Sequence, residues 1–193
     1  EVFASVKRAP NSLAATLREL PGVADAQTTI EQIVRIELPD VPDPVIGQLI
    51  GLDVQHPPRM NRVSVRNGHP LEALRLADNA IPALVSASFA DARGLVPGSR
   101  LTALVNGKRR TLVVSGIALS PEYVFAGLMG MPDLRVFGIF WVPHEALAAA
   151  YDMNGAFNRV SLKLAPGADE RDVVARVTAQ LARYGGHEAH GRK

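Results

Sequence analysis

The stretch from Val96 to Gly107 constrains the fold more than any other part of the sequence. Val96-Pro97-Gly98-Ser99 carries proline and glycine at the two central positions that a type II turn requires. An apolar–polar alternation from Leu101 to Val105 then leads to Asn106-Gly107, the dipeptide that most strongly favours a two-residue β-hairpin. The chain is therefore expected to contain a tight antiparallel β unit with two turns of defined type.

Helices and strands are predicted on both sides of this hairpin. Ser86 is a suitable N-cap and Gly94 a suitable C-terminal glycine for a short helix that precedes the turn. An earlier helix is predicted from Leu13, Leu17 and Leu20, whose spacing places them on one face.

Long strands are predicted where β-branched residues alternate. The run from Val23 to Leu38 indicates one strand, the prolines of Pro39–Pro44 force a loop, and a second strand follows at 46–54. Between His56 and Leu84 the signals weaken, and Ile81-Pro82-Ala83 indicates a turn.

The C-terminal third alternates strands and helices. "VFGIFWV" (Val136–Val142) indicates a buried central strand, and Pro143 is predicted at the first position of the next helix. "NRVSLKL" (158–164) indicates another strand. A last helix has Val174, Val177 and Leu181 on one face, and the tail 187–193 is expected to be mobile. The order predicts an α+β fold interrupted by a small β-rich insertion.

Composition limits the classes of function. The 193 residues suit one large or two small domains, and 21 Lys and Arg against 19 Asp and Glu give a net charge of only +2. With few aromatic residues and no basic helix face, nucleic acid is not an expected partner. The absence of cysteine excludes disulfides and thiol catalysis. No apolar run approaches the roughly 20 residues of a membrane span, and because the chain begins at Glu1 we expect it to be part of a longer protein.

No catalytic motif is recognisable, although four pairs of polar residues are candidate sites: His144 with Glu145, His187 with His190, Glu122 with Tyr123, and Asp40 with Asp43. The first pair lacks the second histidine of a zinc-protease motif. The second pair lies in the predicted tail, where metal binding is adventitious. The third pair is either an acid–base pair in a cleft or a turn that packs locally, and the fourth offers a hard cation only two carboxylates. We expect no catalytic residue, no cofactor and no metal.

A loop of unusual apolar content is the remaining candidate site. "FAGLMGMP" places four apolar side chains between glycines: Phe125, Leu128, Met129 and Met131. Methionine is common at adaptable contact surfaces. The loop either folds back onto its own core or contacts a partner.

Three segments together resemble a known family. They are "LRELPGV" (17–23), the central stretch from Leu84 to Leu119, and the stretch from Val142 to Val177. In their order and spacing they are similar to the extracytoplasmic core domain of FtsX/MacB-type ABC transporter permeases, which include macrolide exporters and lipoprotein-release permeases. The resemblance extends from about Leu13 to Gly186.

The resemblance implies a fold and a domain division. It implies a Porter-like α/β sandwich subdomain formed by 1–65 and 118–193, interrupted by a small β-rich, Sabre-like subdomain at 66–117. The helix and hairpin between Ser86 and Ile117 match that insertion.

It also implies a function, mechanotransmission. The domain would stand on the periplasmic side of the bacterial inner membrane, between transmembrane helices of its own permease, and pass ATP-driven movement to a substrate or partner. Implied partners are those helices, a cytoplasmic ABC ATPase acting indirectly, a second permease copy or paired periplasmic domain, and a periplasmic partner protein. The docking loops that identify macrolide export or lipoprotein release are not recognisable, so the substrate stays open.

Two other classes of function stay open at this point. One is a free-standing extracytoplasmic module that binds an amphiphile or peptide at the "FAGLMGMP" loop, and the other is an enzyme that uses Glu122 and Tyr123. The transporter interpretation makes a geometric prediction: the start of the first helix at Asn11 and the end of the last at Tyr184 should share one end of the molecule.

Overall fold

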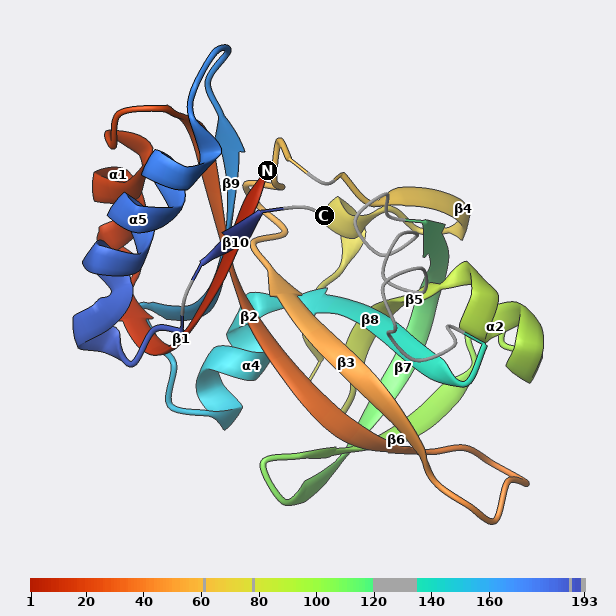
Figure 1. The fold of residues 1–193 in the computed structure, drawn as a ribbon. Coiled ribbons are helices and arrows are strands. Elements are labelled where there is room, and N and C mark those ends of the chain that lie inside the picture. The colour runs from red at the N-terminus through yellow and green to blue at the C-terminus, as the bar shows by residue number, and fades with distance from the viewer. Residues whose placement is uncertain (61, 78, 120–134, 188, 192–193) are drawn as a thin grey trace. The chain divides into compact units, whose positions relative to one another are not determined.

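The computed structural model describes residues 1–60, 62–77, 79–119, 135–187 and 189–191 (Figure 1). They form two compact units. Unit 1 consists of Glu1–Ile30 and Asp152–Lys193, and unit 2 of Glu31–Tyr151. Unit 2 is therefore inserted into the chain of unit 1, which enters it at Ile30 and leaves it at Tyr151.

Unit 1 is a two-layer α/β sandwich, with α1 and α5 together on one face of a sheet (Figure 1). The strand order is β10-β1-β9-β2, and all neighbours are antiparallel. This is the order of a ferredoxin-like βαββαβ motif, with unit 2 inserted between the second and third strands. Its elements are β1 (Val2–Pro10), α1 (Leu13–Arg18), the first half of β2 (Val23–Glu37), β9 (Ala156–Leu164), α5 (Glu170–Leu181), the 3₁₀ turn η3 (Ala182–Tyr184) and β10 (His190–Gly191).

The helices of unit 1 follow from simple spacing rules. In α5, Val173, Val177 and Leu181 recur every four residues and are buried on the sheet, and the predicted Val174 packs against the same core but is only partly buried. The Oδ1 atom of Asp169 caps this helix by accepting a hydrogen bond of 2.9 Å from the backbone N–H of Arg171. Leu17 of α1 is fully buried in the same core.

Unit 2 is a ring of strands. The order β2-β3-β8-β5-β7 is closed by β6, which pairs with β7 on one side and with β2 on the other. Its elements are the second half of β2, β3 (Val45–Leu52), β4 (Ser64–Gly68), the 3₁₀ turn η1 (Leu71–Ala73), β5 (Ile81–Ser86), α2 (Ala87–Arg93), β6 (Arg100–Val105), β7 (Lys108–Leu119), β8 (Phe137–Pro143) and α4 (His144–Ala150). Strand β4 extends the sheet beside the second half of β7.

Strand β8 lies in the middle of unit 2. It is parallel to β3 and antiparallel to β5, and every residue from Phe137 to Pro143 is buried. Buried on both faces, such a strand reads as a continuous apolar run. The ring of Phe140 lies so close to the backbone that a Cβ at Gly138 would be 2.6 Å from its Cε2 atom, so this position needs glycine.

The turns predicted around the hairpin are confirmed. Gly98 has φ 96°, and the N–H of Ser99 donates to the carbonyl of Val96 at 3.0 Å, as in a type II turn. Asn106 and Gly107 have φ values of 48° and 77°, both in the left-handed region that a type I′ hairpin needs. Gly94 ends α2 with φ 66°.

Several local predictions are wrong. Residues 2–10 form the unpredicted β1, and Ile81–Ser86 is strand β5 rather than a turn. Part of the tail expected to be mobile is β10, which pairs with β1. Pro143 ends β8 and occupies the N-cap of α4, one position before the predicted one.

The unit boundaries differ from the predicted division at 65/66 and 117/118. Strands β2, β3 and β8 were placed with the flanking subdomain, but β6 pairs with the end of β2, and β3 pairs along its length with β8. These pairings hold residues 31–151 together as one unit. The α+β class is present, whereas the β-rich insertion at 66–117 and the match of either unit to a Porter-like or Sabre-like subdomain stay predictions.

Candidate functional site

The predicted contact loop lies outside the described residues. Phe125, Leu128, Met129 and Met131 fall within 120–134, as do Glu122 and Tyr123, so the structure places none of them. Whether this loop contacts a partner or packs on its own core therefore stays open.

The other polar pairs are dispersed. His144 and Glu145 begin α4, with Nδ1 and Oε2 3.8 Å apart. His190 lies in β10, where its ring is 6.1 Å from that of Phe3. Within the described ranges, no three His, Asp or Glu side chains are grouped closely enough to hold a metal ion.

Asp53 is a polar site that the sequence did not reveal. It follows β3 and caps a turn, because its Oδ1 atom accepts hydrogen bonds from the backbone N–H groups of Gln55 and His56 at 2.9 and 3.1 Å. Burial raises the pKa of Asp53, but these bonds, the His56 side chain and the charge of His144 lower the pKa by more, so the net pKa is below its ordinary value. The ionised carboxylate of Asp53 therefore stabilises the turn that it caps.

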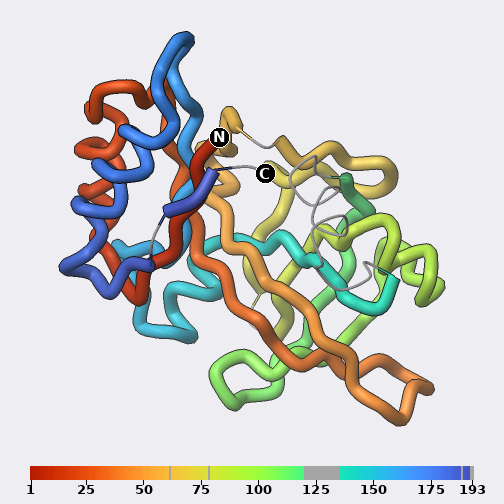
Figure 2. Tube along the Cα trace, in the orientation of Figure 1, coloured from red at the N-terminus to blue at the C-terminus, as the bar shows by residue number. Residues whose placement is uncertain are grey.

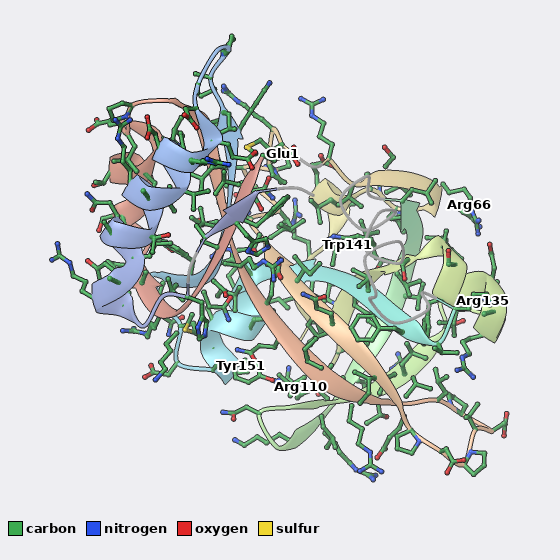
Figure 3. All side chains as sticks on the ribbon, in the orientation of Figure 1. Glu1, Arg66, Arg110, Arg135, Trp141 and Tyr151 are labelled. Carbon is green, nitrogen blue, oxygen red and sulfur yellow. The ribbon has the colours of Figure 1, made fainter. Side chains whose placement is uncertain are left out.

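The hairpin tip is attached to a helix. The backbone N–H of Asn106 donates to Oη of Tyr151 at 3.0 Å, and its side-chain amide donates to the carbonyl of Ala150 at 2.8 Å. Tyr151, labelled in Figure 3, follows the last turn of α4. The hairpin turn is thus held by the end of α4 in addition to its own strand pairing.

The two ends of the described chain lie side by side. Val2 pairs with Gly191 and Phe3 with His190, so β10 runs along the start of β1 (Figure 2). At the other end of β1, Gly185 after η3 lies against the side chain of Lys7. The start of α1 and the end of η3 therefore lie toward the same end of unit 1, and the chain ends leave from the opposite end of β1, while the prediction for the whole molecule stays a prediction.

A pocket opens on unit 2 between the loop after β2 and the turn before β6. Its volume is about 240 Å³. The residues that line it are Leu38, Pro39, Val41, Arg93, Leu95, Ser99 and Arg100, and it is called the Arg93 pocket below. Four of these side chains are apolar and two are cationic.

Comparison by sequence with family models and with curated proteins finds no match. None of the described helices is both long enough and apolar enough to cross a membrane.

Solved structures do share the fold. The extracellular domain of the noncanonic ABC-type transporter YknZ from Gram-positive bacteria is 14% identical, with a TM-score of 0.56 over 100% of this chain and 98% of that one. The periplasmic region of MacB from Actinobacillus actinomycetemcomitans is 9% identical, with a TM-score of 0.56 over 98% and 87%. A domain of a putative permease protein from Porphyromonas gingivalis is 16% identical, with a TM-score of 0.55 over 99% and 90%.

The chain has the fold of these extracytoplasmic transporter domains. The resemblance predicted from sequence order and spacing is thereby confirmed at the level of the fold, as is the α+β class. The alignment covers nearly all of both chains, so the MacB-like fold includes both units. Sequence reasoning missed the two surface features described above, the Arg93 pocket and the paired ends, because each is formed by residues far apart in the chain.

Proposed function

We propose that this chain is the extracytoplasmic domain of an ABC transporter permease subunit and transmits ATP-driven movement from the membrane to a substrate or partner. The observation that carries the proposal is the fold, which this chain shares over nearly its whole length with the YknZ and MacB domains. Those proteins are named as transporters, and a shared fold alone leaves the function of this chain to be tested.

The paired ends of unit 1 support attachment to a membrane. Val2 and Gly191 are neighbours in the sheet, so transmembrane helices before and after the domain would leave it at one place. A displacement of those helices would act on β1 and β10 together. Because β1 also pairs with β9, the displacement would reach the centre of the unit 1 sheet directly.

The links between the units support transmission. The chain crosses from unit 1 to unit 2 twice, at Ile30/Glu31 within β2 and at Tyr151/Asp152 in a turn. Packed strands move as bodies because close-packed interiors deform little. We propose that these two links pass movement from unit 1 to unit 2.

The remaining assignments belong to the same proposal. The domain faces the periplasm at the bacterial inner membrane, and its partners are its own transmembrane helices, a cytoplasmic ABC ATPase acting indirectly, a second permease copy or paired domain, and a periplasmic partner protein. It is not itself catalytic, in keeping with the transporter names of its structural neighbours.

Lengthening the links in the full permease tests the proposal. Six Gly-Ser residues inserted at Ile30/Glu31 and at Tyr151/Asp152 should abolish transport by the permease–ATPase complex in proteoliposomes, while ATP hydrolysis continues. The matched control is the same insertion after Gly167, whose Cβ position is open. Cooperative unfolding of both units checks that the variants fold.

Two results would contradict transmission through the links. One is normal transport by the doubly lengthened permease, and the other is equal loss of transport in the Gly167 control. If the full-length gene encodes no membrane spans beside this domain, the permease assignment itself is wrong.

A further inference from the structure

The Arg93 pocket combines an aliphatic wall with two cations. Leu38, Pro39 and Val41 come from the loop after β2, and Leu95 comes from the turn after α2. Arg93 at the end of α2 and Arg100 at the start of β6 supply the charge. None of the described residues that line it carries a carboxylate.

Arg93 packs against an aromatic ring and has one side-chain donor without a partner among the described residues. Its Nε atom is buried and has no hydrogen-bond partner among the described residues. Its Cζ atom lies 5.8 Å from the centroid of the Phe89 ring, and that fully buried ring packs edge-on against Phe140 at 5.7 Å. Leaving the Nε–H donor buried without an acceptor is costly, and because Arg93 as a whole is only half-buried, a ligand that brings an acceptor to this side chain would be stabilising.

The nearby charges also favour an anion. Three other arginines have carboxylate partners, in the pairs Arg18–Asp25, Arg66–Asp91 and Arg109–Glu37. Neither Arg93 nor Arg100 forms an ion pair with a described carboxylate. Ser99 accepts a hydrogen bond from the N–H of Val96 at 3.0 Å, which leaves its own hydroxyl hydrogen for a ligand. The opposing charge is Asp40, exposed between two residues that line the pocket.

We propose that the Arg93 pocket binds a short anionic amphiphile, an unbranched aliphatic chain that ends in a carboxylate. The chain lies against the four apolar side chains, and the carboxylate accepts hydrogen bonds from Arg93 and Arg100. The pocket is smaller than the ~300–1,000 Å³ typical of drug-sized ligands, which favours a chain of short length. The site is independent of the transport proposal, since it lies wholly within unit 2.

Three probes that differ only in the head group test the charge requirement. Octanoate, 1-octanol and octylammonium are titrated into the 193-residue chain, followed by amide chemical shifts in NMR spectra. Octanoate should bind saturably, with shifts centred on Leu95, Ser99 and Arg100, and at least about tenfold more tightly than either other probe. Shifts that do not saturate, spread over the surface or are equal for octylammonium would overturn the proposal.

Variants test the named residues. Arg93→Gln should weaken octanoate binding about tenfold, to the level of octanol, whereas Arg93→Lys should retain part of the preference because it keeps the charge. Asp40→Asn should tighten octanoate binding by removing the opposing charge. The matched control is Arg171→Gln, an exposed arginine of α5 in unit 1, which should change nothing.

Thermal unfolding of each variant separates loss of binding from loss of folding. Arg93→Gln could lower stability through lost packing on Phe89. In that case the Asp40→Asn variant, which leaves this packing intact, still tests whether the pocket binds an anion. Unchanged octanoate affinity in a folded Arg93→Gln variant, or weaker affinity in Asp40→Asn, contradicts the assignment. Failure of either test leaves the transport proposal unaffected, because the link insertions measure it separately.

Discussion

Single residues set the conformation of the hairpin turn. Asn106 and Gly107 both have positive φ, a region that costs an L-residue roughly 1–2 kcal/mol. No atom lies within 4 Å of a Cβ at Gly107, so any effect of a side chain there comes from the backbone and not from a clash. This position therefore isolates conformational strain from packing.

Gly107→Val should lower the free energy of unfolding by about 1–2 kcal/mol, because valine strongly disfavours the left-handed region. Urea unfolding followed by circular dichroism measures the change. The control is Lys108→Val, next along the chain at an exposed strand position that suits a β-branched residue. If both variants unfold at the same urea concentration, the turn assignment is wrong.

The Arg66–Asp91 pair gives a prediction about pH. Arg66 extends from β4, and its Nη1 and Nη2 atoms donate to Oδ2 and Oδ1 of Asp91 at 3.0 and 2.7 Å (Figure 3). These hydrogen bonds lower the pKa of Asp91 below its ordinary value. Because the folded pKa is the lower one, the stabilisation is present above the unfolded pKa and is lost as the pH falls through the folded pKa.

Arg66→Gln should return the pKa of Asp91 upward, toward its ordinary value, as read from the Cγ chemical shift in an NMR titration. Both side chains are exposed, so added salt should weaken the difference between the two proteins. Arg171→Gln in unit 1 serves as the control. An identical Asp91 titration in the Arg66→Gln variant would show that the pair is absent in solution.

At the scale of elements, the hairpin depends on α4 as well as on its own turn. Tyr151→Phe removes the oxygen that accepts the hydrogen bond from the N–H of Asn106. Amide exchange at Asn106 should become roughly fivefold faster, the equivalent of about 1 kcal/mol. Tyr184→Phe, in unit 1, should leave that exchange rate unchanged. Equal rates in the two variants would contradict the attachment.

The predictable elements are those whose cause is local. The hairpin, β8 and α5 were predicted because turn chemistry, a continuous apolar run and a four-residue spacing each act within one segment. Strand β10 was not, because two residues become a strand only through their pairing with Val2 and Phe3. Its partner β1 was not predicted because Lys7 and Arg8 interrupt the run of apolar residues in the sequence of this strand.

Strand β5 shows why proline misled the prediction. Pro82 has no N–H to donate, which argues against a central strand. In the structure β8 pairs with β5 only at Leu84 and Val85. The beginning of β5, which contains Pro82, therefore pairs with β7 on one side and has no β8 residue paired with it on the other. Ser86 also has a role that its sequence position did not predict. It occupies the predicted N-cap of α2, but its Oγ atom accepts a hydrogen bond of 3.1 Å from the N–H of Ile139 and so joins β5 to β8.

The candidate sites were predictable to a smaller extent. The Arg93 pocket brings together Leu38 and Arg100, which are 62 positions apart in the sequence. The sequence of neither segment predicts that the two lie side by side. Glycine-containing turns at 17–22 and 181–186 each close a helical segment of unit 1. They end α1 and the α5–η3 segment, which occupy equivalent places in the two βαβ halves of unit 1.

At the scale of the whole molecule, the paired ends can be tested by a cross-link. Cysteines at Phe3 and His190 should form a disulfide under mild oxidation, because Cα atoms of facing antiparallel residues lie roughly 4.5–5.5 Å apart, within disulfide range. Mass spectrometry of a tryptic digest detects the linked peptides.

The control moves one cysteine to the other end of β1. Ser12→Cys combined with His190→Cys should give no intramolecular disulfide, since the seven strand residues 4–10, roughly 24 Å long, separate Phe3 from the turn that contains Ser12. A mobile tail would instead give comparable linkage in both proteins, and that result would contradict β10.

The placement of β9 between β1 and β2 also dictates an order of assembly. In unit 1, β1 pairs with β9 and β10, and the first half of β2 pairs with β9. The partners of both early strands thus lie after residue 151 and emerge from the ribosome only when all of unit 2 has been made. Unit 2 therefore has every one of its own strands available first, and the first 30 residues wait, unpaired, for the final 42. Completing unit 2 brings Ile30 and Asp152 to fixed points on one folded body and so removes most of the loop-closure entropy from the last step of synthesis.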